Sequence, residues 1–176
     1  RIEDEHPGLP VVQRLAEELR VWVQMGSLAI RSPAGKIHNR AYTIGSNGEI
    51  VAFYDKIHLF DVDLTNGERY RESETVEPGV LAVTAETPWG TLGLSVCYDL
   101  RFARLYRALA HAGAQFLTVP AAFTKVTGQD HWHVLLRARA IETAAYVFAA
   151  CQCGTHGEAE SYGHSLIIDP CRLSTQ

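Results

Sequence analysis

The sequence lacks the features typical of membrane, secreted and nucleic-acid-binding proteins. It contains no unbroken apolar run near the length of about 20 residues that a transmembrane helix needs. Residues 1–5 (RIEDE) lack the basic and apolar regions of a secretory signal peptide. Basic residues are in the minority, because 16 Lys and Arg stand against 20 Asp and Glu and give a net charge of -4. We therefore expect a soluble, cytoplasmic protein that binds a small neutral or acidic molecule, and neither nucleic acid nor membrane.

Cysteine is too scarce for a disulfide framework, with four residues in a chain of 176. Cys151 and Cys153, together with His156, could be metal ligands, yet alternate residues of a strand point to opposite faces of its sheet. Neither a phosphate-binding P-loop nor a G-x-G-x-x-G dinucleotide motif follows any predicted strand. We therefore expect no metal and no cofactor.

Helical and strand patterns alternate along the chain, which predicts an α/β fold in a single domain, residues 1–176. Apolar residues recur at helical spacing in residues 11–20. Asn47-Gly48 predicts a hairpin turn between strands at 41–44 and 50–54. Further helices are predicted at 104–112 and 131–143, and further strands at 21–25, 92–96, 116–119, 146–150 and 166–168.

Cys97 lies where the predicted strand 92–96 ends and a helix is expected to begin. Asp99 offers a side-chain oxygen that can cap this helix. Open α/β folds bind ligands at the carboxyl ends of their strands, and a helix amino terminus favours the reactive thiolate. Cys97 is therefore the candidate nucleophile, although a free cysteine is often a small buried core residue.

Several sequence blocks resemble those of the nitrilase superfamily of carbon–nitrogen hydrolases, in the order found in that family. The block at the cysteine is CYDLRF, residues 97–102. Upstream lie YDKIHLF at 54–60 and RESE at 71–74, and downstream lie HWHVLLRARAIE at 131–142 and SYGHS at 161–165. One short block can arise by chance, but several in one order are a strong signal. The resemblance is closest to the branch that contains the deaminated glutathione amidases.

This resemblance implies a four-layer α-β-β-α sandwich that pairs with a second copy, so we expect a homodimer or a larger homo-oligomer. It also implies a cysteine-dependent amidase that works through a thioester. In this chemistry Cys97 attacks the substrate, while the charge of Lys56 and the backbone N–H of Tyr98 stabilise the oxyanion. By spacing alone, Lys56 would be interpreted as a solvated lysine at a strand end.

Residues 65–79 form a polar stretch without periodicity, and so long a loop in a compact domain is usually functional. Within it, Glu72 matches the acidic residue that orients the substrate or the lysine in the family. Glu74 lies two residues further on, so an error of register would exchange the two roles.

The chain departs from the family pattern at two places. The family's general base is a glutamate that follows an early apolar strand, and this arrangement does not occur among the 176 residues. We therefore expect the protein to be longer at its amino terminus, and to be clipped after Asp169-Pro170 as well. His133 stands where the family usually has a glutamate, which is either a tolerated change on a helix or a change in pocket charge.

The substrate class stays open among amides, nitriles and N-carbamoyl amines. The branch favours an amide of a small, acidic 2-oxo compound such as deaminated glutathione, and the planar guanidinium of Arg101, Arg137 or Arg139 could hold its carboxylate. The competing hypothesis is a catalytically degenerate member that binds a partner. A serine hydrolase is disfavoured, because GLSVC at residues 93–97 lacks the final glycine of the nucleophile elbow.

Overall fold

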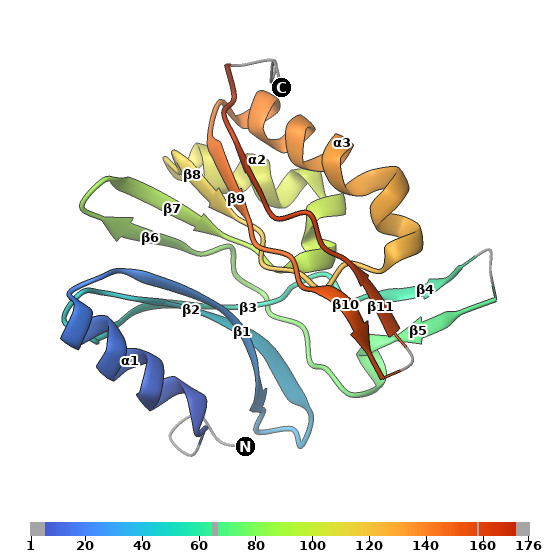
Figure 1. Ribbon diagram of the computed structural model, residues 1–176, viewed down its shortest axis with the longest axis horizontal. Coiled ribbons are helices and arrows are strands. Elements are labelled where there is room, and N and C mark those ends of the chain that lie inside the picture. The colour runs from blue at the N-terminus through green and yellow to red at the C-terminus, as the bar shows by residue number, and fades with distance from the viewer. Residues whose placement is uncertain (1–5, 65–66, 158, 172–176) are drawn as a thin grey trace. The chain divides into compact units, whose positions relative to one another are not determined.

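The computed structural model describes residues 6–64, 67–157 and 159–171. The chain forms two compact units, Arg1–Leu81 and Ala82–Gln176. Each unit has its own sheet and its own helices (Figure 1). The expected single domain stays a prediction.

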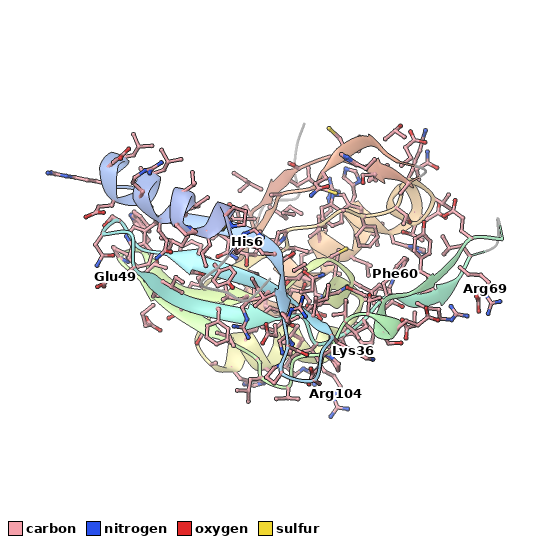
Figure 2. The ribbon with its side chains drawn as sticks, turned by 90° about the horizontal axis from the view of Figure 1, so that it is seen from below. His6, Lys36, Glu49, Phe60, Arg69 and Arg104 are labelled. Atoms are coloured by element: carbon pink, nitrogen blue, oxygen red, sulfur yellow. The ribbon has the colours of Figure 1, made fainter. Side chains whose placement is uncertain are left out.

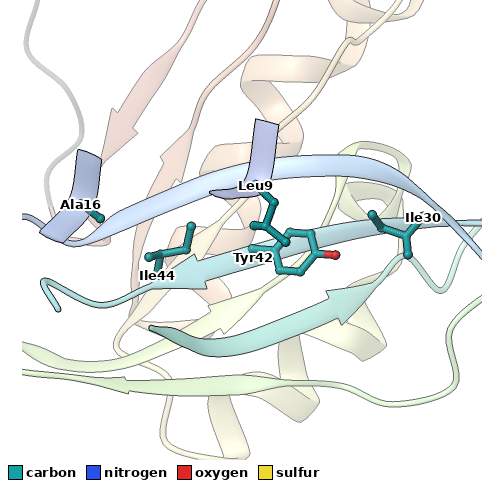
Figure 3. Packing of buried hydrophobic residues seen from close by; sticks show 5 residues of the cluster. All are labelled: Leu9, Ala16, Ile30, Tyr42 and Ile44. Atoms are coloured by element: carbon teal, nitrogen blue, oxygen red, sulfur yellow. The ribbon is translucent and has the colours of Figure 1, made fainter. Parts of the chain in front are cut away.

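The first unit is a helix packed on a three-stranded antiparallel sheet. It consists of α1 (Gly8–Leu19), β1 (Val23–Arg31), β2 (Ile37–Ile44) and β3 (Ile50–Asp55), with the strand order β1-β2-β3. Leu9 and Ala16 of α1 bury their side chains against Ile30, Tyr42 and Ile44 of the sheet (Figure 3). The helix predicted at residues 11–20 is confirmed, and it begins at Gly8.

The contact face of α1 differs from the apolar stripe that the sequence displays. Leu9, Val12 and Ala16 face the sheet, whereas Val11, Leu15 and Leu19 are 43%, 44% and 66% exposed. The two sets alternate around one helix, so spacing alone does not decide which of two apolar stripes meets the sheet.

The hairpin of β2 and β3 follows the predicted turn. Gly48 adopts a φ of 77°, which only glycine adopts without steric cost, and its N–H donates to the carbonyl of Gly45. The register pairs Tyr42 with Phe53 and Arg40 with Asp55. It therefore brings the next residue of β2, Asn39, beside Lys56, whose N–H donates to the Asn39 carbonyl over 3.0 Å.

The rest of the first unit corrects the prediction of an aperiodic loop at residues 65–79. The strands β4 (Asp61–Asp63) and β5 (Arg69–Arg71) pair, and a 3₁₀ turn, η2 (Glu72–Glu74), follows; residues 65–66 lie outside the described part. Asp63 forms ion pairs with Arg69 and Arg71 across this hairpin, and Arg69 extends into solvent (Figure 2). Strands of three residues are too short to show a period of two, which is why the sequence conceals them.

The second unit is built on a five-stranded mixed sheet of order β12-β9-β8-β7-β6. Its strands are β6 (Thr84–Thr87), β7 (Gly90–Leu94), β8 (Phe116–Thr118), β9 (Tyr146–Ala149) and β12 (Leu166–Ile168). The three central strands, β7, β8 and β9, are parallel, so their carboxyl ends meet at one edge. Leu94, Leu117 and Val147 on these strands are fully buried.

Two helices cover the same face of this sheet, α2 (Ala103–His111) and α3 (Lys125–Thr143) (Figure 1). A 3₁₀ turn, η3 (Cys97–Arg101), precedes α2, and a hairpin of β10 (Cys153–His156) and β11 (Ala159–Tyr162) packs near α3. The predicted strands and helices of this unit are present, but α3 begins at Lys125 instead of at residue 131. The prediction missed the first six residues of α3 (KVTGQD, 125–130) because they carry no apolar period. This segment includes Gly128, where a Cβ would lie 2.4 Å from the Tyr162 ring, so the close packing there requires glycine.

Each unit is thus a helical layer on a sheet, the pairing from which an α-β-β-α sandwich is made. Among the described residues, no helix is long and apolar enough to cross a membrane.

Candidate active site

Lys56 follows β3 directly, and only 3% of its side-chain surface is exposed. Its ammonium group is paired with the carboxylate of Glu72 in η2. The same carboxylate accepts hydrogen bonds from Nδ2 of Asn39 over 3.2 Å and from the backbone N–H of Phe60 over 2.6 Å. A buried ammonium group is costly unless an opposite charge compensates it. Glu72 supplies that charge, and its three partners fix its position.

Glu72, and not Glu74, is therefore the acidic residue beside the lysine. Glu74 is exposed, and its side chain forms no hydrogen bond or ion pair with any residue in the described part of the chain. The structure brings Lys56 and Glu72 together, as the sequence predicts, and adds Asn39, which sequence reasoning missed. The hairpin register could have found Asn39, because pairing Ala41 with Tyr54 brings residue 39 beside residue 56.

Gly79 contacts the backbone at Lys56, because its N–H donates to the Lys56 carbonyl over 2.9 Å. A Cβ at Gly79 would lie 2.1 Å from the carbonyl oxygen of Asp55, so backbone would have to move. We expect Gly79→Ala to lower the free energy of unfolding by about 1–3 kcal/mol, as measured by chemical denaturation. Gly8→Ala is the matched control, since a Cβ there meets its nearest neighbours at an ordinary 3.5 Å. Equal stability of the two variants would contradict this close approach.

Cys97 begins η3, three residues after the end of β7, and it is half-buried. Its backbone lies in the left-handed region, with a φ of 51°. Its N–H donates to the carbonyl of Pro120, which follows β8, over 2.9 Å. A non-glycine residue keeps such a conformation only where its surroundings fix it, and such residues cluster at functional sites. Cys97 therefore lies at the carboxyl ends of two neighbouring parallel strands, as predicted.

Asp99 is fully buried and closes the turn that holds Cys97. Its Oδ2 accepts a hydrogen bond from the N–H of Val96 over 2.9 Å, and its own N–H donates to the Val96 carbonyl. The prediction that Asp99 caps the helix at residues 104–112 is therefore wrong, because α2 has no side-chain cap. A 3₁₀ turn intervenes between the strand and α2, and the carboxylate stabilises this turn.

A buried hydroxyl network lies next to this turn. Ser95 Oγ donates to the carbonyl of Thr118 over 2.7 Å, so the hydroxyl of Tyr106 must be the donor in its 2.7 Å bond to Ser95. Burial, and next the negative charge of Asp99, raise the pKa of Tyr106 well above its usual range. Tyr106 is therefore a permanent neutral donor that fixes the end of β7.

Tyr98 follows Cys97 in η3, and its ring packs edge-on against Phe102 with 5.5 Å between the centroids. The guanidinium carbon of Arg101 lies 5.7 Å from the centre of the Tyr98 ring. Nη2 of Arg101 donates to Nδ1 of His131 over 2.9 Å. Since Nδ1 accepts, His131 carries its ring proton on Nε2.

The three candidate arginines differ in environment. Arg101 is half-buried beside Tyr98, and Arg137 is exposed on α3. Arg139 is only 5% exposed, and its guanidinium donates to the Leu100 carbonyl and to Glu142. These contacts favour a structural role for Arg139 over the predicted contact with substrate.

His133 packs with two aromatic rings near the end of the chain. Its ring is edge-on to Tyr162 and to His164, with centroids 5.8 and 5.3 Å away. Burial, followed by the charges of His164 and Arg137, lowers the pKa of His133 below the usual value of 6.5. This shift favours the neutral form of His133, and the replacement of the family's glutamate removes a negative charge.

The other three cysteines differ from Cys97. Cys153 and Cys171 are exposed, whereas Cys151 is half-buried and burial raises the pKa of its thiol. His156 contacts the carbonyl of Cys153 through Nε2 over 3.2 Å. No three His, Cys, Asp or Glu side chains converge on a possible metal position in the parts of the chain that the structure describes.

Comparisons with known proteins agree with these features. Residues 8–171 match the family model for carbon-nitrogen hydrolases. The deaminated glutathione amidase of Yersinia enterocolitica is 46% identical over 173 residues, which cover 94% of this chain and 60% of that protein. The chain thus spans about 60% of the length of this relative.

Two solved structures resemble the chain. The NitFhit protein of C. elegans has a TM-score of 0.87 and 40% identity, over 93% of this chain and 41% of that chain. An amidase variant from Nesterenkonia sp. AN1 has a TM-score of 0.75 and 26% identity, over 92% of this chain and 58% of that chain. Its active-site cysteine carries the covalently added acetamide moiety of fluoroacetamide.

Proposed function

Because the chain belongs to the carbon-nitrogen hydrolase family, whose nitrilase-type α/β fold it shares, we propose that the whole protein hydrolyses a small amide through a thioester on Cys97. The observation that carries the proposal is the backbone of Cys97. It is held in the left-handed region at the end of a central parallel strand, with its N–H bonded to Pro120. The adduct on the active-site cysteine of the Nesterenkonia amidase variant, in which the acetamide moiety of fluoroacetamide is bound covalently, supports the role of the cysteine as a nucleophile.

The reaction proceeds through two tetrahedral intermediates. A general base, for which we expect the family's glutamate, takes the proton of Cys97, and Sγ attacks the amide carbon. The N–H of Tyr98 and the charge of Lys56 stabilise the oxyanion. The base then protonates the leaving nitrogen, the carbon–nitrogen bond breaks, and ammonia or an amine departs. Water, deprotonated by the same base, attacks the thioester carbon, and the acid is released as Cys97 regains its proton.

Glu72 acts in this scheme through Lys56. The carboxylate compensates the charge of the buried ammonium group, and Asn39 and Phe60 hold the carboxylate. We therefore assign Glu72 the role of positioning the lysine, with any contact to substrate as a second contribution.

We propose an amide of a small acidic 2-oxo compound as the substrate, because the Yersinia relative is a deaminated glutathione amidase. Arg101 and Arg137 are the side chains that stay partly accessible for a carboxylate, whereas Arg139 is buried.

A substrate panel tests this proposal. Ammonia release is measured on an acidic 2-oxo amide, its methyl ester, a nitrile and an N-carbamoyl amine. We expect the acidic amide to be preferred, and its ester to lose roughly tenfold or more in kcat/KM, because a charge-assisted contact to arginine is lost. Preferred nitrile turnover would contradict the amide assignment. Binding without any turnover would favour the degenerate binding protein.

The assembly and the location are further parts of the proposal. The family resemblance implies a homodimer or a larger homo-oligomer, and Val134 and Ile141 of α3 support it because they are 67% and 63% exposed. A cytoplasmic location stays a prediction of the sequence.

A further inference from the structure

Arg139 is a buried cation on α3 that contacts η3, the turn that begins at Cys97. Its Nε donates to the carbonyl of Leu100, within η3, over 3.0 Å. Its guanidinium carbon lies 5.3 Å from the centre of the Tyr106 ring, and its Nη1 donates to Glu142 over 2.7 Å. Three contacts from three elements hold a side chain that is 5% exposed.

The Leu100 carbonyl is a group that the turn itself leaves unsatisfied. Within η3 the N–H of Asp99 bonds to Val96 and the N–H of Phe102 bonds to Asp99. The carbonyl of Leu100, which is fully buried, finds its donor in α3. A cation at the last carbonyls of a helical turn is also favoured by the dipole of the turn.

This contact completes the restraint of a strained backbone. Cys97 has a φ of 51°, its N–H is bonded to Pro120, and Asp99 fixes Val96 on its amino-terminal side. Arg139 fixes the opposite end of the same five-residue turn. The peptide between Cys97 and Tyr98, which carries the proposed oxyanion donor, lies between these restraints.

We propose that Arg139 is a positioning residue that aims the backbone N–H of Tyr98 at the oxyanion, and that it does not bind substrate. The inference rests on the proposed function, because it assumes that Tyr98 is the oxyanion donor. A small misplacement of such a donor weakens stabilisation of the transition state far more than binding of the ground state.

Two reagents distinguish the placement of the oxyanion donor from the reactivity of the Cys97 thiolate. Acylation of Cys97 by p-nitrophenyl acetate passes through a tetrahedral oxyanion, whereas alkylation by iodoacetamide is a direct displacement without one. Both rates scale with the thiolate fraction, so their ratio cancels any change in thiol pKa. The rates are measured on the Cys97 peptide of the whole protein by mass spectrometry.

We expect Arg139→Lys to lower the acylation-to-alkylation ratio by about tenfold or more, since it keeps the charge but loses the Nε donor. Glu142→Gln, which removes the charge of a partly exposed partner of the guanidinium, should lower it by a smaller factor in a folded protein. Arg107→Met, an exposed arginine of α2, is the matched control and should leave the ratio unchanged. In Arg139→Lys, kcat for amides should fall while KM stays the same.

Each remaining outcome overturns a different statement. An unchanged ratio in both Arg139→Lys and Glu142→Gln, or a parallel fall of both rates, would overturn the positioning role. A raised KM for acidic amides, with an unchanged acylation-to-alkylation ratio, would show that Arg139 binds substrate. A wild-type Cys97 that is alkylated but never acylated would overturn the inference, whereas failure on amides alone would overturn only the proposed function.

Discussion

Replacing Cys97 with alanine is expected to abolish amide hydrolysis and to leave the fold of its unit intact. The thiolate forms the covalent bond to the substrate, so its loss should reduce kcat by about ten-thousandfold or more. The turn should survive, because the backbone groups of residues 96, 97 and 100 keep their bonds to the Asp99 carboxylate, the Pro120 carbonyl and the Arg139 guanidinium. Alanine also meets no greater steric penalty than cysteine at a φ of 51°. Ammonia release and far-ultraviolet circular dichroism measure the two parts of this expectation.

Labelling at low pH supplies the matched test on the wild-type protein. An ordinary thiol has a pKa of about 8.5, so at pH 6 less than about 1% of it is thiolate. Cys153 and Cys171 are exposed but lie outside this turn, and burial raises the pKa of Cys151. Iodoacetamide at pH 6 should therefore modify Cys97 first. Equal labelling of the four thiols, or an active Cys97→Ala variant, would remove Cys97 as the nucleophile.

The sequence predicts the parts of the site that depend on local pattern. Asn47-Gly48 specifies the turn of the β2–β3 hairpin. Lys56 directly follows the last residue of β3, at the opposite end of this hairpin from the turn. An apolar strand followed by a polar turn places Cys97 at the edge of a parallel sheet. These features arise from residues that are neighbours in the chain, where propensity and turn chemistry act directly.

The supporting contacts depend on residues that are distant in the sequence. Arg139 meets the Leu100 carbonyl across 39 residues, and Asn39 meets Glu72 across 33. The sequence offers Arg139 as a substrate ligand because a planar guanidinium can hold a carboxylate. Only the packing of α3 against η3 shows that this guanidinium is buried and satisfied.

Replacing Lys56 with methionine is expected to lower kcat by about a hundredfold or more and to spare the fold. Methionine keeps the length of the side chain and removes its charge, so the oxyanion loses its proposed cation. Glu72 then loses one of three partners but keeps the donors of Asn39 and Phe60. Because 18% of the Glu72 side chain is exposed, water can also solvate the remaining charge. Wild-type turnover by the folded Lys56→Met variant would rule out the lysine as the oxyanion cation.

Glu72→Gln is expected to impair both turnover and stability, because it leaves the ammonium group of Lys56 buried without a compensating charge. Removing one partner of a buried ion pair typically lowers the free energy of unfolding by about 3 kcal/mol. Glu74→Gln is the matched control, and it should change neither quantity because that side chain is exposed. The double variant Lys56→Met with Glu72→Gln should regain stability relative to Glu72→Gln and remain inactive, since it removes both charges together. A stable, active Glu72→Gln variant would show that the pair serves neither the fold nor the reaction.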